Sequence, residues 1–267
     1  MTLFQALVLG ILQGLAEFLP ISSSAHLALA PWILGWPEPG LSFDVALHFG
    51  TLLAVLIYFR AEWGRLIAAA LQILRTRSAE TVEQRRVLYL ILATIPGGLA
   101  GVALDKYAEQ AFRDPRLIAA MLIVMGIILW LVDRAAATTR PLGAMRWPDA
   151  LVSGVAQVFA LIPGVSRSGA TITAGRALRF DRASAATFSF LMSMPIIAAA
   201  SILKLPHLLR EGGLGGQLAV GVAASALSGW LAIGVLMRYV TRHSYGAFAV
   251  YRVLLGAAVI LLALHRG

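Results

Sequence analysis

The chain of 267 residues is 59% hydrophobic and only 13% charged, and it contains no cysteine. Soluble domains carry about 25% charged residues, so this composition, together with several long uncharged runs, excludes an ordinary soluble fold and predicts a polytopic helical membrane protein. The lack of cysteine excludes a disulfide framework and a thiolate metal site. The net charge of +9 comes without a long basic tract, so we expect no nucleic-acid partner.

The first expected element covers residues 2–34, which are apolar at both ends and polar in the middle. The polar middle runs from Gln13 to His26 and contains Glu17, Pro20 and three serines. Pro20 has no amide hydrogen, and the serines that follow can bond to backbone groups in place of helical partners. We therefore predict a re-entrant hairpin, in which a helix enters the membrane, breaks, and is followed by a helix that leaves by the same face. The alternative is one kinked helix that spans the membrane.

Further apolar runs predict six membrane spans. These spans are expected at residues 43–59, 87–104, 117–132, 183–203, 217–237 and 244–264. The second of them is expected to be interrupted at Pro96. Three connecting segments are expected to be exposed to water, namely residues 60–86, 105–116 and 133–148. A second polar stretch, at 149–173, predicts a second re-entrant hairpin.

The two halves of the chain echo each other. The pattern Gln-x-x-Ala-x5-Ser-x-Ser begins at Gln13 and again at Gln157. Because each half has three spans, an odd number, the second copy must be inserted upside down. We therefore expect an all-α integral membrane protein of a single domain, with a first repeat at 1–132 and a second, inverted repeat at 149–267. Broken helices that meet near the midplane of such a repeat place a polar site between the copies.

The distribution of Lys and Arg predicts the orientation in the membrane. With residues 60–86 in the cytoplasm, most of the 22 Lys and Arg residues fall on the cytoplasmic side, as the positive-inside rule requires. The basic residues expected on the outer side are Lys106, Arg113, Arg116, Lys204, Arg210 and Arg266. Both termini should then face outward.

The first polar stretch offers ligands for a cation. Gln13 and Glu17 are four residues apart, so they share one helix face before the break. A carboxylate beside an amide oxygen suits a hard cation such as Mg²⁺, which takes a few protein oxygens together with waters and substrate phosphates. An ionisable group at this depth costs at least about 2.5 kcal/mol on insertion scales, so Glu17 should face a protein interior or a wet cavity.

The residues after the break offer groups for an anion and for catalysis. Ser22, Ser23 and Ser24 bring hydroxyls and backbone donors, and amides freed from helical bonding can point at an anion. His26 supplies a base or a nucleophile. Taken singly, each has a structural explanation, because an intramembrane serine usually bonds back to its own helix.

The second polar stretch sets a guanidinium among hydroxyls. Its polar side chains are Ser166, Arg167, Ser168 and Thr171. Planar, bidentate arginine is the group best shaped for phosphate oxygens, and a doubly charged phosphate would offset the desolvation of Arg167. The structural alternative is an ion pair between Arg167 and Glu17, which is also compatible with a resting state of the same site.

At these two stretches the sequence resembles a known family. Gln13-x-x-x-Glu17, the following Phe-Leu-Pro-Ile-Ser-Ser and His26 resemble the first motif of the bacterial undecaprenyl-diphosphate phosphatases, in which the first position is Glu or Gln. Pro163-Gly-x-Ser-Arg-Ser-x-x-Thr171 resembles the second, and the resemblance extends over essentially the whole chain. It implies a multi-pass enzyme of the bacterial inner membrane that removes the terminal phosphate of a C55 lipid diphosphate. The product is the lipid carrier for peptidoglycan and other cell-wall polymers, and overproduction of such enzymes confers bacitracin resistance.

The resemblance also implies roles for individual residues. Glu17, with Gln13, would position a divalent cation, Mg²⁺ or Ca²⁺, on the diphosphate, and Arg167 would stabilise charge in the transition state. His26 would be the general base or the phospho-accepting nucleophile, and Ser23, activated by His26, is its rival as nucleophile. The expected substrate-binding residues are Gln13, Ser22, Ser24, Ser166, Ser168, Thr171 and Arg252. The family favours an active site at the periplasmic face.

Several alternatives stay open. Arg252 either holds a phosphate or has a structural partner such as Asp44, and His48 is expected to be structural. A polyprenyl-lipid flippase or secondary transporter would also use inverted repeats and intramembrane Arg and Glu, but it would not need His26. A purely structural or partner-binding membrane protein would need none of these buried charges. A homodimer is compatible with the sequence, which does not define the prenyl chain length.

Overall fold

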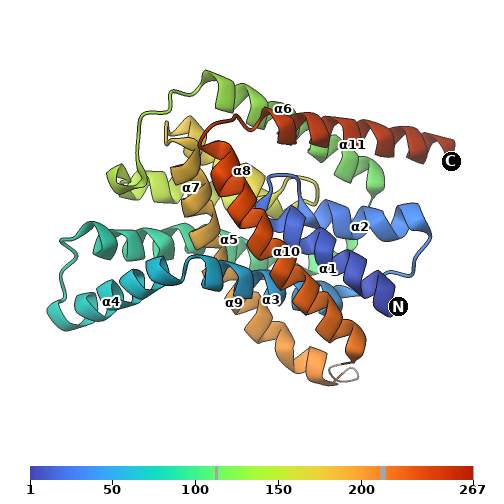
Figure 1. Cartoon of the computed structure of the whole chain (residues 1–267), viewed down its shortest axis with the longest axis horizontal. Coiled ribbons are helices and arrows are strands. Elements are labelled where there is room, and N and C mark those ends of the chain that lie inside the picture. The colour runs from blue at the N-terminus through green and yellow to red at the C-terminus, as the bar shows by residue number, and fades with distance from the viewer. Residues whose placement is uncertain (112–113, 211–214, 267) are drawn as a thin grey trace.

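The computed structural model describes residues 1–111, 114–210 and 215–266, and the side chains within them except at 41, 104–111 and 203–210. The described chain is mostly helical and has no β-strand, only an isolated bridge between Arg140 and Phe180. Its helices are α1 (Leu3–Phe18), α2 (Ser23–Leu34), α3 (Leu41–Tyr58), α4 (Arg60–Thr76), α5 (Val82–Ala111), α6 (Pro115–Ala135), α7 (Trp147–Val158), α8 (Arg167–Ala177), α9 (Arg182–Arg210), α10 (Gly216–Val240) and α11 (Gly246–His265), with 3₁₀ turns η1 (Leu142–Ala144) and η2 (Phe159–Leu161) (Figure 1). The prediction of an all-α fold is confirmed.

Five of the described helices are long and apolar enough to cross a membrane, namely α5, α6, α9, α10 and α11. A sixth span results only if α3 and α4 are counted together, and these two helices are bent by 83° where they meet. The chain is therefore a multi-pass membrane protein with five or six candidate spans.

The expectation that residues 60–86 form an exposed segment is wrong in part, because most of this segment is helical. Leu66 and Ala69 of α4 are buried, whereas Arg65 and other basic side chains of α4 point outward, so the helix is amphipathic. Glu62 of α4 forms ion pairs with Arg65 and with Arg86 of α5, which fixes the amphipathic helix to the next span.

Pro96 does not interrupt its helix, contrary to the prediction. α5 runs unbroken from Val82 to Ala111, so the expected exposed loop at 105–116 is helical as far as Ala111, and residues 112 and 113 lie outside the described residues. Membrane helices tolerate an internal proline where neighbouring groups cover the freed backbone. α5 packs against α7 and α9, which provide such cover.

Asp133 is buried, although the sequence suggested that it begins a water-exposed segment. Its carboxylate accepts from the Nε atoms of Arg176 at 2.6 Å and Arg182 at 2.9 Å, and from the backbone amide of Tyr245 at 3.0 Å. Arg176 is itself fully buried. This charge cluster joins α6, α8 and α9 to the start of α11, and a buried acid is tolerated because two arginines pair with it.

The first helix of each polar stretch packs on a long helix of the other half, α1 on α10 and α7 on α5. The approach of α1 to α10 requires glycine, because a Cβ at Gly14 would lie 2.0 Å from the Ser228 hydroxyl and 2.5 Å from the Ser225 carbonyl oxygen. α6 also packs on α11, and α3 on α9. Since α8 contacts both α1 and α6, the two polar stretches meet between the halves of the chain.

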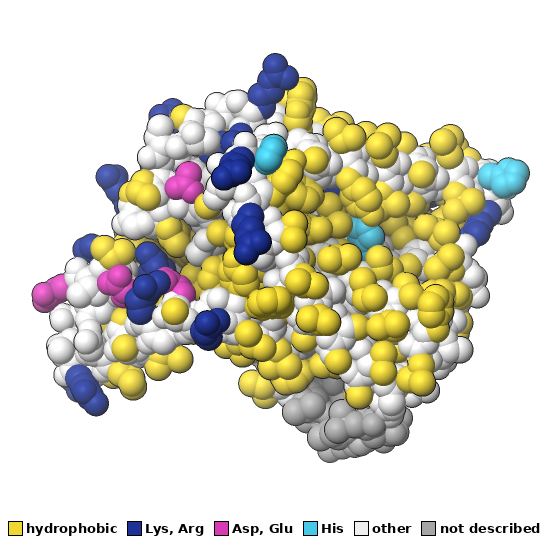
Figure 2. All heavy atoms as spheres, viewed as in Figure 1, with side chains coloured by type: hydrophobic (Ala, Val, Ile, Leu, Met, Phe, Trp, Pro, Cys, Tyr) yellow, Lys and Arg dark blue, Asp and Glu magenta, His cyan; other side chains and the backbone are white. Residues whose placement is uncertain are grey.

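The surface is largely apolar. On the face shown in Figure 2, hydrophobic side chains cover the centre and right, whereas most charged side chains lie at the left, around α4 and the connection from α6 to α7. Large side chains such as Leu99 and Val102 are exposed, as a lipid-facing surface requires. The predicted orientation stays a prediction, and the side chains of Lys106, Arg113, Lys204 and Arg210 lie outside the described part of the chain.

Candidate active site

The two polar stretches break in the same way. Ser22 (φ +76°) and Ser166 (φ +73°) both adopt positive φ, which costs a residue with a Cβ roughly 1–2 kcal/mol. Each serine caps the helix that follows, because its hydroxyl accepts from the amide three residues on, at Ala25 (3.4 Å) and Gly169 (3.0 Å). Each hydroxyl also lies within hydrogen-bond distance of the serine hydroxyl two residues on. The serine hydroxyls thus stabilise the strained turns, and a glycine at these positions would lack the capping hydroxyl.

Arg252 of α11 links the two breaks. Its guanidinium is fully buried and donates to the carbonyl oxygen of Pro20 (3.2 Å) at the first break and to those of Gly164 (2.7 Å) and Val165 (2.9 Å) at the second. A further bond goes to the Leu122 carbonyl oxygen of α6. These contacts satisfy backbone carbonyls that the breaks leave without helical partners. They therefore favour a structural role for Arg252 over the binding of a phosphate.

Glu17 is the centre of the cluster. Its Oε1 accepts from Arg167 Nη2 at 3.0 Å, although the two residues are 150 positions apart. Its Oε2 accepts from the Ser23 hydroxyl at 2.6 Å and from the Gln13 amide at 3.1 Å. The carboxylate is almost fully buried, while Ser23 and Arg167 stay partly exposed beside it. The structure therefore brings together four of the predicted site residues, with Arg167 and Glu17 paired.

One nitrogen of the Arg167 guanidinium makes no hydrogen bond. Its Nη1 donates to the Ser189 carbonyl oxygen of α9 at 3.1 Å, whereas its buried Nε has no hydrogen-bond partner. Thr171 bonds through its hydroxyl to the Ser189 hydroxyl at 2.7 Å, and Ser168 donates to the Leu19 carbonyl oxygen at 3.2 Å. In this state the Ser168 hydroxyl links the two halves, and the Thr171 hydroxyl links α8 to α9 within the second half.

His26 faces Tyr251, which no pattern in the sequence marks as a site residue. Its Nδ1 lies 2.7 Å from the Ser22 carbonyl oxygen, so Nδ1 carries a hydrogen and Nε2 of the neutral ring accepts from the Tyr251 hydroxyl, also at 2.7 Å. The structure thus brings Ser23 to Glu17 rather than to His26. Tyr251 stands next to Arg252 in an apolar run, and no sequence signal separates it from a lipid-facing tyrosine. Ser24 is exposed just after the break.

His48, which was expected to be structural, lies beside Glu17. Its Nε2 lies 3.5 Å from Glu17 Oε2, and its Nδ1 lies 2.7 Å from the Asp44 carbonyl oxygen. The sequence assigned it a structural role because a single histidine in an apolar run carries no further signal. The position of α3 beside α1 brings it to the carboxylate.

The residues around Glu17 fit a divalent cation. Glu17 supplies a carboxylate, and the buried Oε1 of Gln13 has no hydrogen-bond partner. Within the described chain there is no group of three or more His, Cys, Asp or Glu side chains that would form a closed metal cage. A site with few protein oxygens leaves room for waters and substrate phosphates, which is how Mg²⁺ is commonly bound.

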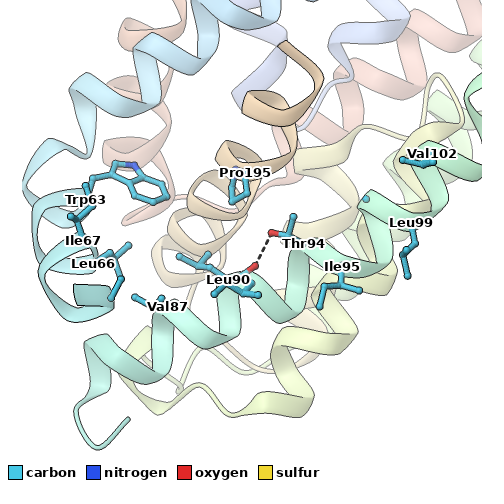
Figure 3. Close-up of a pocket in the computed structure, with 13 residues that line it drawn as sticks. Trp63, Leu66, Ile67, Val87, Leu90, Thr94, Ile95, Leu99, Val102 and Pro195 are labelled. Carbon is cyan, nitrogen blue, oxygen red and sulfur yellow. Dashed lines mark hydrogen bonds between the residues drawn. The ribbon is translucent and has the colours of Figure 1, made fainter. Parts of the chain in front are cut away.

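A separate apolar groove of about 620 Å³ lies between α4, α5 and α9. Figure 3 shows Trp63 and Leu66 of α4 facing Leu90 and Thr94 of α5, with Pro195 of α9 closing one side. The Thr94 hydroxyl donates to the Leu90 carbonyl oxygen at 2.7 Å. The groove therefore offers hydrocarbon contacts and no charged group for a phosphate.

Comparison with known proteins gives consistent results. The family model described as bacitracin resistance protein BacA matches residues 6–258. A protein of Gemmatimonas aurantiaca named undecaprenyl-diphosphatase is 63% identical over 259 residues, which cover 97% of each chain. Relatives of the same name from Pelotomaculum thermopropionicum (50% identical, 100% of this chain and 98% of the relative) and Desulforudis audaxviator (47% identical, 99% of each) are similar to this chain from end to end.

Proposed function

This chain belongs to the bacitracin resistance protein BacA family, and we infer from that membership and from the Glu17–Arg167 cluster that it is an undecaprenyl-diphosphatase. It hydrolyses undecaprenyl diphosphate to undecaprenyl phosphate and inorganic phosphate. The reaction recycles the lipid carrier for peptidoglycan and other cell-wall polymers and accounts for the link to bacitracin resistance. The observation that carries the chemistry is the 3.0 Å contact between a carboxylate and a guanidinium that the two polar breaks supply separately.

Arg167 is suited to bind the diphosphate. Its Nε is unused, and its Nη2 carries a second N–H beside the one that Glu17 accepts, so an incoming phosphate can take one N–H from each nitrogen in a bidentate arrangement. The pair with Glu17 keeps the buried guanidinium compensated when no substrate is bound. A divalent cation held by Glu17 and Gln13 would neutralise developing negative charge on the phosphates.

The geometry favours Ser23 as the nucleophile. Its hydroxyl donates to Glu17 at 2.6 Å, so the carboxylate can accept the proton as the serine oxygen attacks the terminal phosphorus. The bond from that phosphorus to the bridging oxygen breaks, undecaprenyl phosphate leaves, and the phosphoryl group stays on Ser23. Water then attacks the phosphoserine, inorganic phosphate is released, and the proton on Glu17 returns to the serine oxygen. His26 would take a proton from this water through the Tyr251 hydroxyl, which donates to its Nε2.

The first test is phosphate release from a polyprenyl diphosphate by the purified protein in detergent, with and without EDTA. We expect release that requires a divalent cation and that His26→Ala and Arg167→Ala each abolish. His243 and Arg75 are exposed, so His243→Ala and Arg75→Ala serve as matched controls that should retain activity. If the folded protein releases no phosphate, the flippase alternative gains support and lipid translocation in reconstituted vesicles would be measured.

A phosphoenzyme separates the two candidate nucleophiles. Rapid acid quench of the reaction with substrate labelled in the terminal phosphate should yield an acid-stable phosphoserine that is lost in Ser23→Ala. An acid-labile adduct that is lost in His26→Ala, but kept in Ser23→Ala, would instead make His26 the nucleophile.

We also propose that the fold is an inverted repeat with two re-entrant hairpins. The matching caps at Ser22 and Ser166 and the matching contacts of α1 with α10 and α7 with α5 support this arrangement. α2 and α8 contain 12 and 11 residues, so at about 1.5 Å per residue they are far shorter than a hydrocarbon core of about 30 Å.

We propose, from the family resemblance, that the active site opens to the periplasmic side of the bacterial inner membrane. Because the chain has no cysteine, Ser24→Cys provides a single thiol beside the site. In intact cells a membrane-impermeant maleimide should label Ser24→Cys and should not label Arg75→Cys, which lies in the segment assigned to the cytoplasm. Labelling of Arg75→Cys alone would reverse the orientation.

The long prenyl chain needs an apolar path, and we assign it to the groove between α4, α5 and α9. Pro195 lies six residues after Ser189, so the groove begins roughly 9 Å along α9 from the carbonyl that Arg167 contacts. A Cβ at Gly98 meets no atom within 4 Å, so Gly98→Phe fills the groove without a clash at its Cβ. We expect this variant to raise KM for a C55 diphosphate while leaving KM for farnesyl diphosphate unchanged. An equal effect on both substrates would place the chain elsewhere.

A further inference from the structure

We propose that His48 is a third protein ligand of the divalent cation, beside Glu17 and Gln13, and that its nitrogen makes the site prefer a first-row transition ion such as Mn²⁺ over Ca²⁺. The proposal rests on the cation-dependent phosphatase function above. It assigns a role to a partly exposed histidine that the chemistry described so far does not use.

The hydrogen bonding of His48 fixes which ring nitrogen faces Glu17. A carbonyl oxygen only accepts, so the 2.7 Å contact of Nδ1 with the Asp44 carbonyl oxygen means that Nδ1 carries a hydrogen. In the neutral ring Nε2 then presents a lone pair toward Glu17. Histidines that bind metals almost always donate their other ring N–H in this way, to a carbonyl or a carboxylate.

The contact between His48 Nε2 and Glu17 Oε2 needs a positive charge. Two lone pairs facing each other repel, and a cation between them would turn this repulsion into attraction. The 3.5 Å distance is long for a hydrogen bond. The distance instead matches the separation of two ligands of one ion. Metal–ligand bonds of about 2.0–2.2 Å at tetrahedral or octahedral angles separate neighbouring ligand atoms by about 3–3.6 Å.

A third donor is next to this pair. Gln13 is fully buried, its Nε2 lies 3.1 Å from the same Oε2 of Glu17, and its Oε1 has no partner. Rotation of the terminal amide by 180° exchanges the two atoms, which turns a carbonyl oxygen toward the same Oε2 of Glu17. The side chain of His48 is 32% exposed, so a hydrated ion can reach the group from that side.

The donor types determine the ion. A carboxylate and an amide oxygen suit Mg²⁺, Ca²⁺ and Mn²⁺ alike, but imidazole favours the first-row transition ions. One nitrogen among oxygen ligands therefore selects Mn²⁺ over Ca²⁺ at this site.

The test uses Mn²⁺ itself as the probe, bound to the purified full-length protein in detergent. Pulsed EPR detects the coupling of Mn²⁺ to a coordinated histidine nitrogen. We expect this coupling in the wild type, its loss in His48→Gln, and its retention in His26→Gln and in His243→Gln. The Mn²⁺ dissociation constant should rise by about tenfold or more in His48→Gln, whereas Ca²⁺ affinity, measured by competition, should change little because glutamine supplies an oxygen.

Three results would overturn the proposal: no Mn²⁺ binding, no nitrogen coupling in the wild type, or coupling that persists in His48→Gln and disappears in His26→Gln. If His48→Gln does not fold, labelling with ¹⁵N-histidine in the background of His26→Gln, His207→Gln, His243→Gln and His265→Gln leaves His48 as the one labelled histidine, and the changed coupling then identifies it. Phosphate release by the wild type is measured in parallel. Release without nitrogen coupling would refute only the role of His48, and coupling without release would refute the enzymatic function instead.

Discussion

Replacing Arg252 by methionine should loosen both polar breaks at once. The guanidinium makes four hydrogen bonds of 2.7–3.2 Å to the carbonyl oxygens of Pro20, Leu122, Gly164 and Val165. Hydrogen bonds from a charged donor contribute about 1.5–3 kcal/mol each, and this gain is partly offset by the desolvation of a fully buried charge. Methionine fills the space of the arginine stem but leaves four carbonyls without this donor.

We expect Arg252→Met to lower the free energy of unfolding by about 3–5 kcal/mol, the usual effect of removing one partner from a buried charged network. The stability of Arg252→Lys should lie between that of the wild type and that of Arg252→Met, because one ammonium group cannot reach both breaks. Unfolding would be followed by intrinsic fluorescence in detergent. Arg266→Met is the matched control, since Arg266 also donates to backbone carbonyls but is exposed, and it should change stability by less than about 1 kcal/mol.

A different outcome would refute the structural role. If Arg252→Met unfolds as the wild type does and only raises KM for the diphosphate, Arg252 is a substrate ligand, as the sequence also allowed. If the variant loses stability and activity together, the breaks depend on it.

Three further variants test other contacts. Tyr251→Phe removes one neutral hydrogen bond to His26, so kcat should fall about two- to tenfold with unchanged thermal stability, and an unchanged kcat would mean that Tyr251 only packs. Asp133→Asn removes the charge that pairs with two arginines, so thermal unfolding should show a free energy of unfolding lowered by about 3 kcal/mol or more. The control Glu80→Gln, at an exposed site, should leave this free energy almost unchanged. Gly14→Ala introduces a Cβ 2.5 Å from the Ser225 carbonyl oxygen, so it should lower the free energy of unfolding by about 1–3 kcal/mol. It should also lower kcat, because the shift of α1 displaces Glu17 on the same helix. Wild-type stability and rate would contradict the tight approach of α1 to α10.

The sequence predicted Glu17 and Arg167 at the centre of the site because a charge inside an apolar run has a high free-energy cost. An acid and an arginine inside apolar runs require compensation, and the structure pairs Glu17 with Arg167. His48 and Tyr251 could not be predicted in the same way. A histidine or tyrosine in a helix of a membrane protein is common, and its partner depends on how α3 and α11 pack against the rest of the chain.

The same reasoning explains the errors in the fold. Asp133 stands at the end of an apolar run, where a charge usually marks the return to water, and only the distant Arg176 and Arg182 allow it to be buried. Residues 60–76 read as exposed because of their arginines, although the apolar residues between them recur with helical spacing. The packing of one amphipathic side against a neighbouring helix is a tertiary property that local charge does not reveal.

The position of Arg252 in the chain has a consequence for biogenesis. α11 leaves the ribosome after the helices that form the two breaks, and it carries both the arginine that satisfies these breaks and the tyrosine that meets His26. Until it docks on α6, the carbonyls at both turns lack their donor inside the membrane. A nascent chain synthesised only as far as residue 245 therefore holds Glu17, Ser23 and Arg167 and still has no assembled site, so the site forms only after α11 has been made and has docked.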